Sequence, residues 1–433
     1  MAYRFSIKYL TVLIIYYTLT SCTAQKEPQE NLPPPNIVWL VSEDNSMHYL
    51  KMFDDNGIET PHIESLATQG LTYTRAFSNA AVCSAARSTI ISGCYGPRLA
   101  SHYHRKIQKV PMPESVEMFP AYLKKAGYYT TNNSKEDYNF IKPNNVWDES
   151  SNKASWRNRA ENQPFFHVFN TNISHEGKLH FKQNSLKNNP TTTDQESFKV
   201  QPNHPNTELF KYTNAFYRDK IVEMDKKIGE LINQLKEDGL YEDAFVFYYG
   251  DHGGVLPGSK GYLYETGLHV PLVVHVPEKY KHLVPNKIGS KVEGFVSFVD
   301  LGPTVLSLAG IEVPEGMDGK PFLGKKVSLE DINGRDETFS YADRFDEKYD
   351  MVRALRKGNY KYVRNYQPFN YDGLMNQYRY RQLAYEEWAQ LYEAGALNEI
   401  QSHFYVSKPV EQLFDIESDP FETNNLAQDP AYK

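Results

Sequence analysis

The sequence predicts an α/β fold, with a large, mostly parallel sheet sandwiched by helices and a smaller α+β domain at its C-terminal end. Four short apolar runs have the composition of buried parallel strands: Ile37–Val41, Phe165–Phe169, Ala244–Tyr249 and Leu272–Val276. Helical patterns separate them, and strands that alternate with helices form parallel sheets covered on both faces. The chain has 433 residues, 40% of them hydrophobic, which is enough for a sizeable core.

The clearest helix is expected over Glu208–Gly239, where apolar residues recur every three to five positions and Gly239 supplies a stop. A shorter helix is expected over Ser115–Ala126. Both lie in the larger domain, assigned to residues 36–333. In such sheets, functional groups usually lie at the carboxyl ends of the strands.

The smaller domain, with antiparallel strands, is assigned to residues 334–433. Met351–Arg364 alternates loosely between apolar and polar residues around Lys357–Asn359, which predicts a β-hairpin. Tyrosines are then frequent over Tyr366–Tyr392.

The first residues are predicted to direct export. Arg4 and Lys8 precede the apolar run Leu10–Leu19, which is shorter than the ~20 residues of a spanning helix. The run ends in Leu-Thr-Ser-Cys, which resembles a bacterial lipobox in which Cys22 is lipidated. An ordinary signal peptide with an incidental cysteine is the alternative.

Residues 1–22 are therefore assigned to a lipoprotein-type signal peptide. Residues 23–35, rich in Pro, Glu and Gln, are assigned to a flexible tether. We expect an exported protein, lipid-anchored to the membrane at the bacterial cell envelope and facing the periplasm. The formal net charge of −7 argues against nucleic acid as a partner.

Two of the predicted strands end in acidic groups. Glu43 and Asp44 follow the first strand, and Asp251 and His252 follow the strand that ends at Tyr249. Adjacent carboxylates repel one another unless a cation neutralises them, and hard oxygen ligands suit calcium or magnesium. Acidic residues that only cap the following helices are the alternative.

Residues 81–89 read Ala-Val-Cys-Ser-Ala-Ala-Arg-Ser-Thr. They match the pattern of Cys, any residue, Pro or Ala, any residue, Arg, with Cys83 and Arg87 at its ends. This segment resembles the type I, formylglycine-dependent sulfatases of the alkaline phosphatase superfamily. The alternative for Cys83 is a disulfide with Cys94, since an exported protein can form one.

Further segments in the family's order extend the resemblance over nearly the whole mature chain. They are Pro35-Asn36, Thr60-Pro61-His62-Ile63, Ser92-Gly93-Cys94-Tyr95, Gly127-Tyr128-Tyr129-Thr130, Lys260-Gly261, Tyr264-Glu265-Thr266-Gly267, Val270-Pro271-Leu272, Asp300-Leu301-Gly302-Pro303-Thr304, Leu413-Phe414-Asp415 and Asp419-Pro420-Phe421-Glu422.

The resemblance implies that Cys83 is oxidised by a formylglycine-generating or maturase enzyme. The hydrated aldehyde would attack sulfur and later release sulfate. The resemblance also implies a calcium ion, with magnesium as the alternative, bound by Glu43, Asp44, Asp251, His252 and the modified Cys83. Most relatives have Asp at position 43, and many have Asn at position 252.

The remaining catalytic roles also come from the resemblance. Arg87 and Lys135 would orient the nucleophile, Lys260 would contact the sulfate, and His175 would protonate the leaving oxygen. Solvated surface charges are the alternative for Arg87 and Lys260.

One position departs from the family. Many relatives have a histidine two residues after the lysine that corresponds to Lys135, where this chain has Asp137. Either Asp137 or another residue, such as His104, would act as the base. His104 is a candidate substrate contact, with a structural role as the alternative.

The sequence therefore predicts a sulfatase for sulfate esters or sulfamates of sulfated carbohydrates. Ulvan-like algal oligosaccharides and glycosaminoglycans are the candidate substrates, because the chain resembles bacterial polysaccharide sulfatases and N-sulfoglucosamine sulfohydrolases. The alternatives are an arylsulfatase, a phosphatase or phosphonate hydrolase of the same superfamily, and a non-catalytic, lipid-anchored glycan-binding protein.

Overall fold

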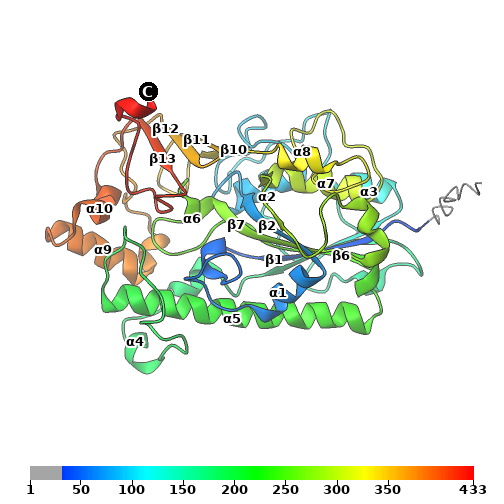
Figure 1. The fold of residues 1–433 in the computed structure, drawn as a ribbon, viewed down its shortest axis with the longest axis horizontal. Helices are drawn as coiled ribbons and strands as arrows, with labels where there is room; N and C mark the ends of the chain where they lie inside the picture. Colours follow the sequence, from blue (N-terminus) through cyan, green and yellow to red (C-terminus); the bar gives the residue numbers. More distant parts are fainter. Residues whose placement is uncertain (1–31) are drawn as a thin grey trace, which may run out of the picture. The chain divides into compact units, whose positions relative to one another are not determined.

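A nine-stranded mixed sheet runs through the computed structural model, which describes residues 32–433 (Figure 1). The strand order is β4-β3-β5-β1-β6-β7-β2-β8, and β9 also pairs with β2. The strands are β1 (Asn36–Ser42), β2 (Gly70–Phe77), β3 (Tyr129–Asn133), β4 (Glu149–Ser150), β5 (Phe165–Thr171), β6 (Ala244–Gly250), β7 (His269–His275), β8 (Lys291–Val292) and β9 (Val296–Ser297).

The parallel part of the sheet confirms three of the predicted strands. β1 lies between β5 and β6 and is parallel to both, and β3 is parallel to β5. Apolar and aromatic side chains fill both faces, and every residue of β6 is buried. This is the pattern of strands covered by helices on both sides.

The predicted direction of the fourth strand was wrong. β7 is antiparallel to both β6 and β2. The segment between β6 and β7 contains only one short helix, α6 (Glu265–Leu268). Without a crossover helix to carry it to the opposite edge, the chain re-enters the sheet at the edge where β6 ends.

Helices cover both faces of the sheet, as predicted (Figure 1). Val38 and Leu40 of β1 pack in a core with α1 (Pro61–Thr68) and α5 (Glu208–Glu237). The alternate residues of β1 face a second core, which includes residues of α2 (Cys83–Ser92) and α7 (Leu301–Leu308).

The two helix predictions differ in their outcome. The long helix is confirmed as α5, and Gly239, with a φ of 67°, follows its end. The shorter helix is confined to α3 (Pro120–Lys125), because Pro120 occupies its first turn, where a missing N–H costs nothing.

The C-terminal part contains a four-stranded antiparallel sheet, in the order β10-β11-β12-β13. The predicted hairpin is confirmed as β11 and β12, with Gly358 in the turn at a φ of 53°. The exact boundary at residue 334 stays a prediction. The remaining elements are β10 (Glu337–Ala342), β11 (Val352–Lys357), β12 (Tyr360–Asn365), β13 (Glu411–Asp415), α4 (Ser185–Asn188), α8 (Leu329–Asn333), α9 (Leu383–Glu393) and α10 (Glu399–Ser402).

The predicted signal peptide, Cys22 and most of the predicted tether lie outside the described residues. Within residues 32–433, no helix combines the length and the apolar character that a membrane crossing requires.

Four buried histidines are expected to make the fold sensitive to acid. Burial lowers the pKa of His48, His204 and His275 to about 4, and that of His167 to about 3. An unfolded histidine takes up a proton near pH 6.5. Below that pH the unfolded chain binds more protons than the folded one, so the free energy of unfolding falls as the pH decreases.

Urea unfolding between pH 6 and 5 measures this effect, because the slope approaches about 1.4 kcal/mol per pH unit for each histidine below pH 6.5. Glu422, whose pKa burial raises to about 6, opposes part of the loss. His167→Asn removes one such group and should reduce the slope by about 1.4 kcal/mol per pH unit. An unchanged slope in this variant would contradict the assignment.

Candidate active site

Two parallel strands bring the predicted acidic groups together at one edge of the sheet. Ser42, at the end of β1, pairs in register with Gly250, at the end of β6. The amide of Asp251 donates to the carbonyl of Ser42 at 3.0 Å, and the amide of Asp44 donates to Oδ1 of Asp251 at 2.9 Å. The expected meeting of the two acidic segments is therefore confirmed.

Cys83 is the first residue of α2 and is fully buried. All ten residues of α2 are buried, and many of them are small, so the helix fits within the core. Its N-terminal end, where helix dipoles favour negative charge, lies at the site. The predicted nucleophile, Cys83, therefore lies at an electropositive position.

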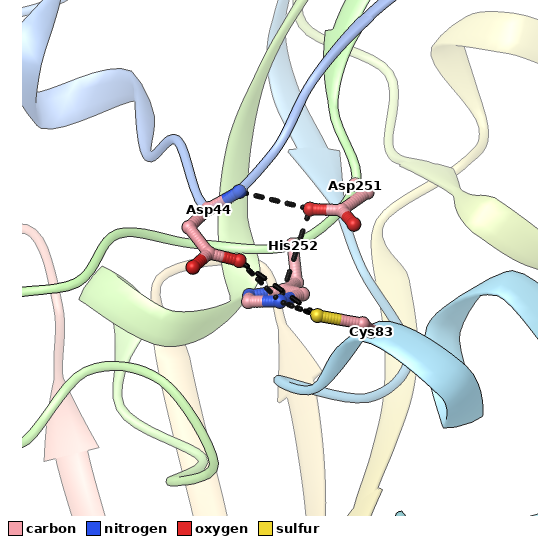
Figure 2. A group of neighbouring side chains, drawn as sticks. All are labelled: Asp44, Cys83, Asp251 and His252. Atoms are coloured by element: carbon pink, nitrogen blue, oxygen red, sulfur yellow. Dashed lines mark hydrogen bonds and ion pairs between the residues drawn. The ribbon is translucent and has the colours of Figure 1, made fainter. Parts of the chain in front are cut away.

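Cys83, Asp44, Asp251 and His252 form one cluster (Figure 2). His252 Nε2 lies 2.9 Å from Asp44 Oδ1 and 3.2 Å from Cys83 Sγ. One ligand-type atom from each of the four residues lies within 4.8 Å of the others. Two buried carboxylates, an imidazole and the atom at position 83 are donors that fit a divalent cation.

Glu43 is placed differently from the other predicted metal ligands. Its Oε2 pairs with Nζ of Lys135 at 2.5 Å, and Glu43 is not a member of the four-residue cluster. Burial raises the pKa of Glu43, although Lys135 opposes this shift. Glu43 as a metal ligand stays a prediction.

Cations surround the position of Cys83. Burial alone would raise the pKa of the Cys83 thiol, but Lys135, Lys260 and His252 together hold it well below its usual range. Opposite charges near 4 Å attract by about 4 kcal/mol at an effective dielectric of ~20. The surroundings of residue 83 therefore stabilise negative charge.

Arg87 contacts the acidic cluster through Asp251. Its guanidinium binds Oδ2 of Asp251 through Nε and Nη2, both at 3.0 Å. Burial would raise the pKa of Asp251, but His252 and Arg87 lower it to about 2. Asp251 is thus ionised throughout the physiological range.

Lys260 and His175 lie together at the open side of the cluster. Lys260 Nζ contacts Asp44 Oδ2 at 2.8 Å and lies 3.4 Å from His175 Nε2. Burial would lower the pKa of His175, but the charge of Asp44 raises it overall. The imidazole is therefore suited to hold a proton.

Two further residues of this site had no predicted role. Glu176 binds Lys260 at 2.8 Å, and Asn170 accepts a hydrogen bond from Arg87 at 2.7 Å. Asn170 lies near the end of β5, at the same sheet edge as the acidic segments. Its position near a strand end could have identified Asn170 as a site residue from the sequence.

Asp137 is engaged by an arginine. Its carboxylate accepts hydrogen bonds from Nε and Nη2 of Arg105, at 3.2 and 3.1 Å. Burial would raise the pKa of Asp137, but Arg105 lowers it overall, which makes a poor proton acceptor. His104, the other candidate base, pairs with Asp346 at 3.1 Å, and its contact with substrate stays a prediction.

A pocket of about 510 Å³ opens onto this site. Lys260, His175 and His104 are among its lining residues. The suggested disulfide is not formed, since Cys83 and Cys94 are both free.

Comparison with known proteins agrees with the motifs. The model of the Sulfatase family matches residues 35–311, and that of the C-terminal part of N-sulphoglucosamine sulphohydrolase matches residues 250–403. An ulvan-active sulfatase of Formosa agariphila is 37% identical, over 94% of this chain and 74% of that protein. N-sulphoglucosamine sulphohydrolase of Homo sapiens is 22% identical, over 92% of this chain and 87% of that protein.

The chain also shares its fold with proteins of known structure. A structure solved in complex with its substrate, D-glucosamine-2-N,6-O-disulfate, superimposes with a TM-score of 0.63 at 16% identity. The match covers 92% of this chain and 94% of the other. Together with the motifs, these matches show that the chain belongs to the sulfatase family and is a sulfuric ester hydrolase.

Proposed function

We propose that the protein releases sulfate from sulfated oligosaccharides, using a formylglycine made from Cys83 and a bound calcium ion. The supporting observation is the buried position of Cys83 beside two carboxylates and three cationic side chains. A formylglycine would supply a hydrated aldehyde as nucleophile, and a calcium ion would polarise oxygen atoms.

The residues of the chain have separable roles in this proposal. Arg87 fixes Asp251, and Lys135 supplies positive charge beside position 83. Lys260, held between Asp44 and Glu176, faces the pocket and would bind a sulfate oxygen. His175 would protonate the oxygen of the departing sugar.

Calcium is preferred over magnesium because the carboxylates of Asp44 and Asp251 lie in the cluster and that of Glu43 lies beside it. Calcium accepts six to eight oxygen ligands in flexible geometry, whereas magnesium demands a near-ideal octahedron. Glu43 lies beside the cluster and could add a ligand after a rotation away from Lys135.

The substrate class rests on the relatives and on the pocket. The ulvan-active relative covers nearly the whole chain, and the pocket of about 510 Å³ has the size of a small-molecule site. Sulfate esters of an ulvan-like polysaccharide are therefore the first candidates. Sulfamates and glycosaminoglycans come second, through the N-sulphoglucosamine sulphohydrolase match.

Mass spectrometry of the peptide that contains Cys83 tests the proposal, on protein produced with a formylglycine-generating enzyme. The mass should match conversion of the thiol to the aldehyde, and the protein should release sulfate from ulvan oligosaccharides. Hydrolysis of phosphate or phosphonate esters as efficiently as sulfate esters would favour the phosphatase alternative. An oxidised protein that releases neither would favour the glycan-binding alternative.

We further propose that Cys22 is lipidated and holds the exported protein at the cell envelope, facing the periplasm. The lipobox-like residues before Cys22 support this. Wild-type protein should sediment with membranes of the producing cell, and Cys22→Ala should shift it to the soluble fraction. Equal partition of the two proteins would argue for an ordinary signal peptide.

A further inference from the structure

Two arginines line the pocket without a role in the chemistry derived above. Arg105 and Arg381 share this pocket with His175 and Lys260. They come from distant parts of the chain, since Arg105 precedes β3 and Arg381 ends the short 3₁₀ helix Arg379–Arg381. Their common feature is a guanidinium group beside the site where sulfate would bind.

Arg105 is fixed from two sides. Its backbone amide donates to Ser84 Oγ at 2.7 Å, next to Cys83 in the chain. Its guanidinium is held by both carboxylate oxygens of Asp137, yet the side chain remains 57% exposed. Asp137 therefore orients Arg105, whose side chain lines the pocket and stays more than half exposed.

Arg381 is less constrained. Within residues 32–433 its guanidinium has no hydrogen bond or ion pair, and it lies 5.5 Å from the centre of the Tyr378 ring. The side chain of Tyr378 lies close to the loop that contains His175. A Cβ added at Gly177 would lie 3.2 Å from Tyr378 Oη and 3.3 Å from His175 Nδ1.

Arg105 is already ion-paired with Asp137, whereas, among the described residues, the acidic side chains that line the pocket do not pair with either arginine. Asp346 is bonded to His104 at 3.1 Å, and Glu176 is bonded to Lys260 at 2.8 Å. Glu347, exposed in the same pocket, has no ion pair within residues 32–433 and opposes the arginines only from a solvated position.

We propose that Arg105 and Arg381 bind a second anionic group of the substrate, in addition to the sulfate that is released. This inference rests on the proposed function. Guanidinium groups bind planar carboxylates and sulfates through paired hydrogen bonds. The second group is a carboxylate or another sulfate, on the same sugar or its neighbour, and Asp137 is a positioning residue for Arg105.

Three forms of one sulfated disaccharide distinguish these cases. The first carries a uronate, the second is its carboxyl-reduced counterpart, and the third carries a second sulfate in place of the carboxylate. The preferred form among the first and third identifies the anion. Arg105→Ala and Arg381→Ala should each lower kcat/KM on that form by about 10- to 100-fold, mainly through KM.

On the carboxyl-reduced form, the same variants should change kcat/KM by about threefold or less. Asp137→Asn should reproduce part of the Arg105→Ala effect on KM. Arg364→Ala is the matched control, because Arg364 is also exposed and paired, with Glu411 at 2.9 Å, but does not line the pocket. This control should behave as wild type on all three forms.

Equal losses on the forms with and without the second anion would overturn the proposal, as would no loss on any form. A fall in kcat on all forms with Asp137→Asn would make Asp137 a base instead of a positioning residue. Failure of the proposed function is separate, since oxidised wild-type protein would then release no sulfate from any form.

Discussion

Cys83→Ala is expected to abolish sulfate release, with kcat falling by a factor on the order of 10⁴ or more. Alanine cannot be oxidised to the aldehyde, and no other described side chain lies in the same place at the N-terminal end of α2. The measurement is sulfate release under single-turnover conditions, on wild type and variant produced with the same formylglycine-generating enzyme.

Cys94→Ala is the matched control, because Cys94 is also a free, buried cysteine in the described part of the chain. Its Sγ contacts the carbonyls of Ser92 and Gly316, both at 3.4 Å, and lies outside the acidic cluster. This variant should retain activity close to wild type. Substantial sulfate release by Cys83→Ala would exclude a nucleophile made from Cys83.

Asp251→Asn is expected to remove the response of the protein to calcium. Asp251 combines two functions, because it lies in the acidic cluster and balances the buried charge of Arg87. The variant leaves that guanidinium without its counter-charge, which costs about 3 kcal/mol or more of the free energy of unfolding. It also removes a carboxylate from the proposed cation site.

Thermal unfolding with and without calcium measures both effects. A ligand that binds only the folded state raises the melting temperature of wild type, and this shift should be absent in Asp251→Asn. Sulfate release should fall on the order of 10³-fold.

Asp225→Asn is the control for general destabilisation. Asp225 is also buried, and it accepts hydrogen bonds from the backbone amides of Ile63 and His62 at 2.9 and 3.2 Å. This variant should be less stable but should keep its calcium shift. If Asp251→Asn kept a full calcium shift, the assigned cation site would be wrong.

Local pattern was sufficient for most of the fold but not for strand direction. Runs such as Ala244–Tyr249 and the period of α5 depend on burial alone, so the sequence reveals them. The direction of β7 depends instead on the path of the segment between β6 and β7, which returns to the sheet at the end where β6 leaves it. The apolar run Leu272–Val274 of β7 is as typical of a buried parallel strand as of an antiparallel one.

The candidate site was predictable where its residues follow strand ends or stand in motifs. Asp44, Cys83 and Asp251 meet because of the parallel register of β1 and β6 and the position of α2. Arg381 and Tyr378 could not be found in this way. They belong to an irregular segment, and only its packing against the His175 turn brings them to the pocket.

The complete burial of α2 also fixes an order of events during biogenesis. Cys83 has no exposed surface in the folded chain, and the nine residues that follow it are buried as well. An enzyme that converts Cys83 to the proposed formylglycine would need access to the thiol, and the folded core does not expose it. The proposed oxidation would therefore have to precede folding, and each new molecule would become active or inactive before its core forms.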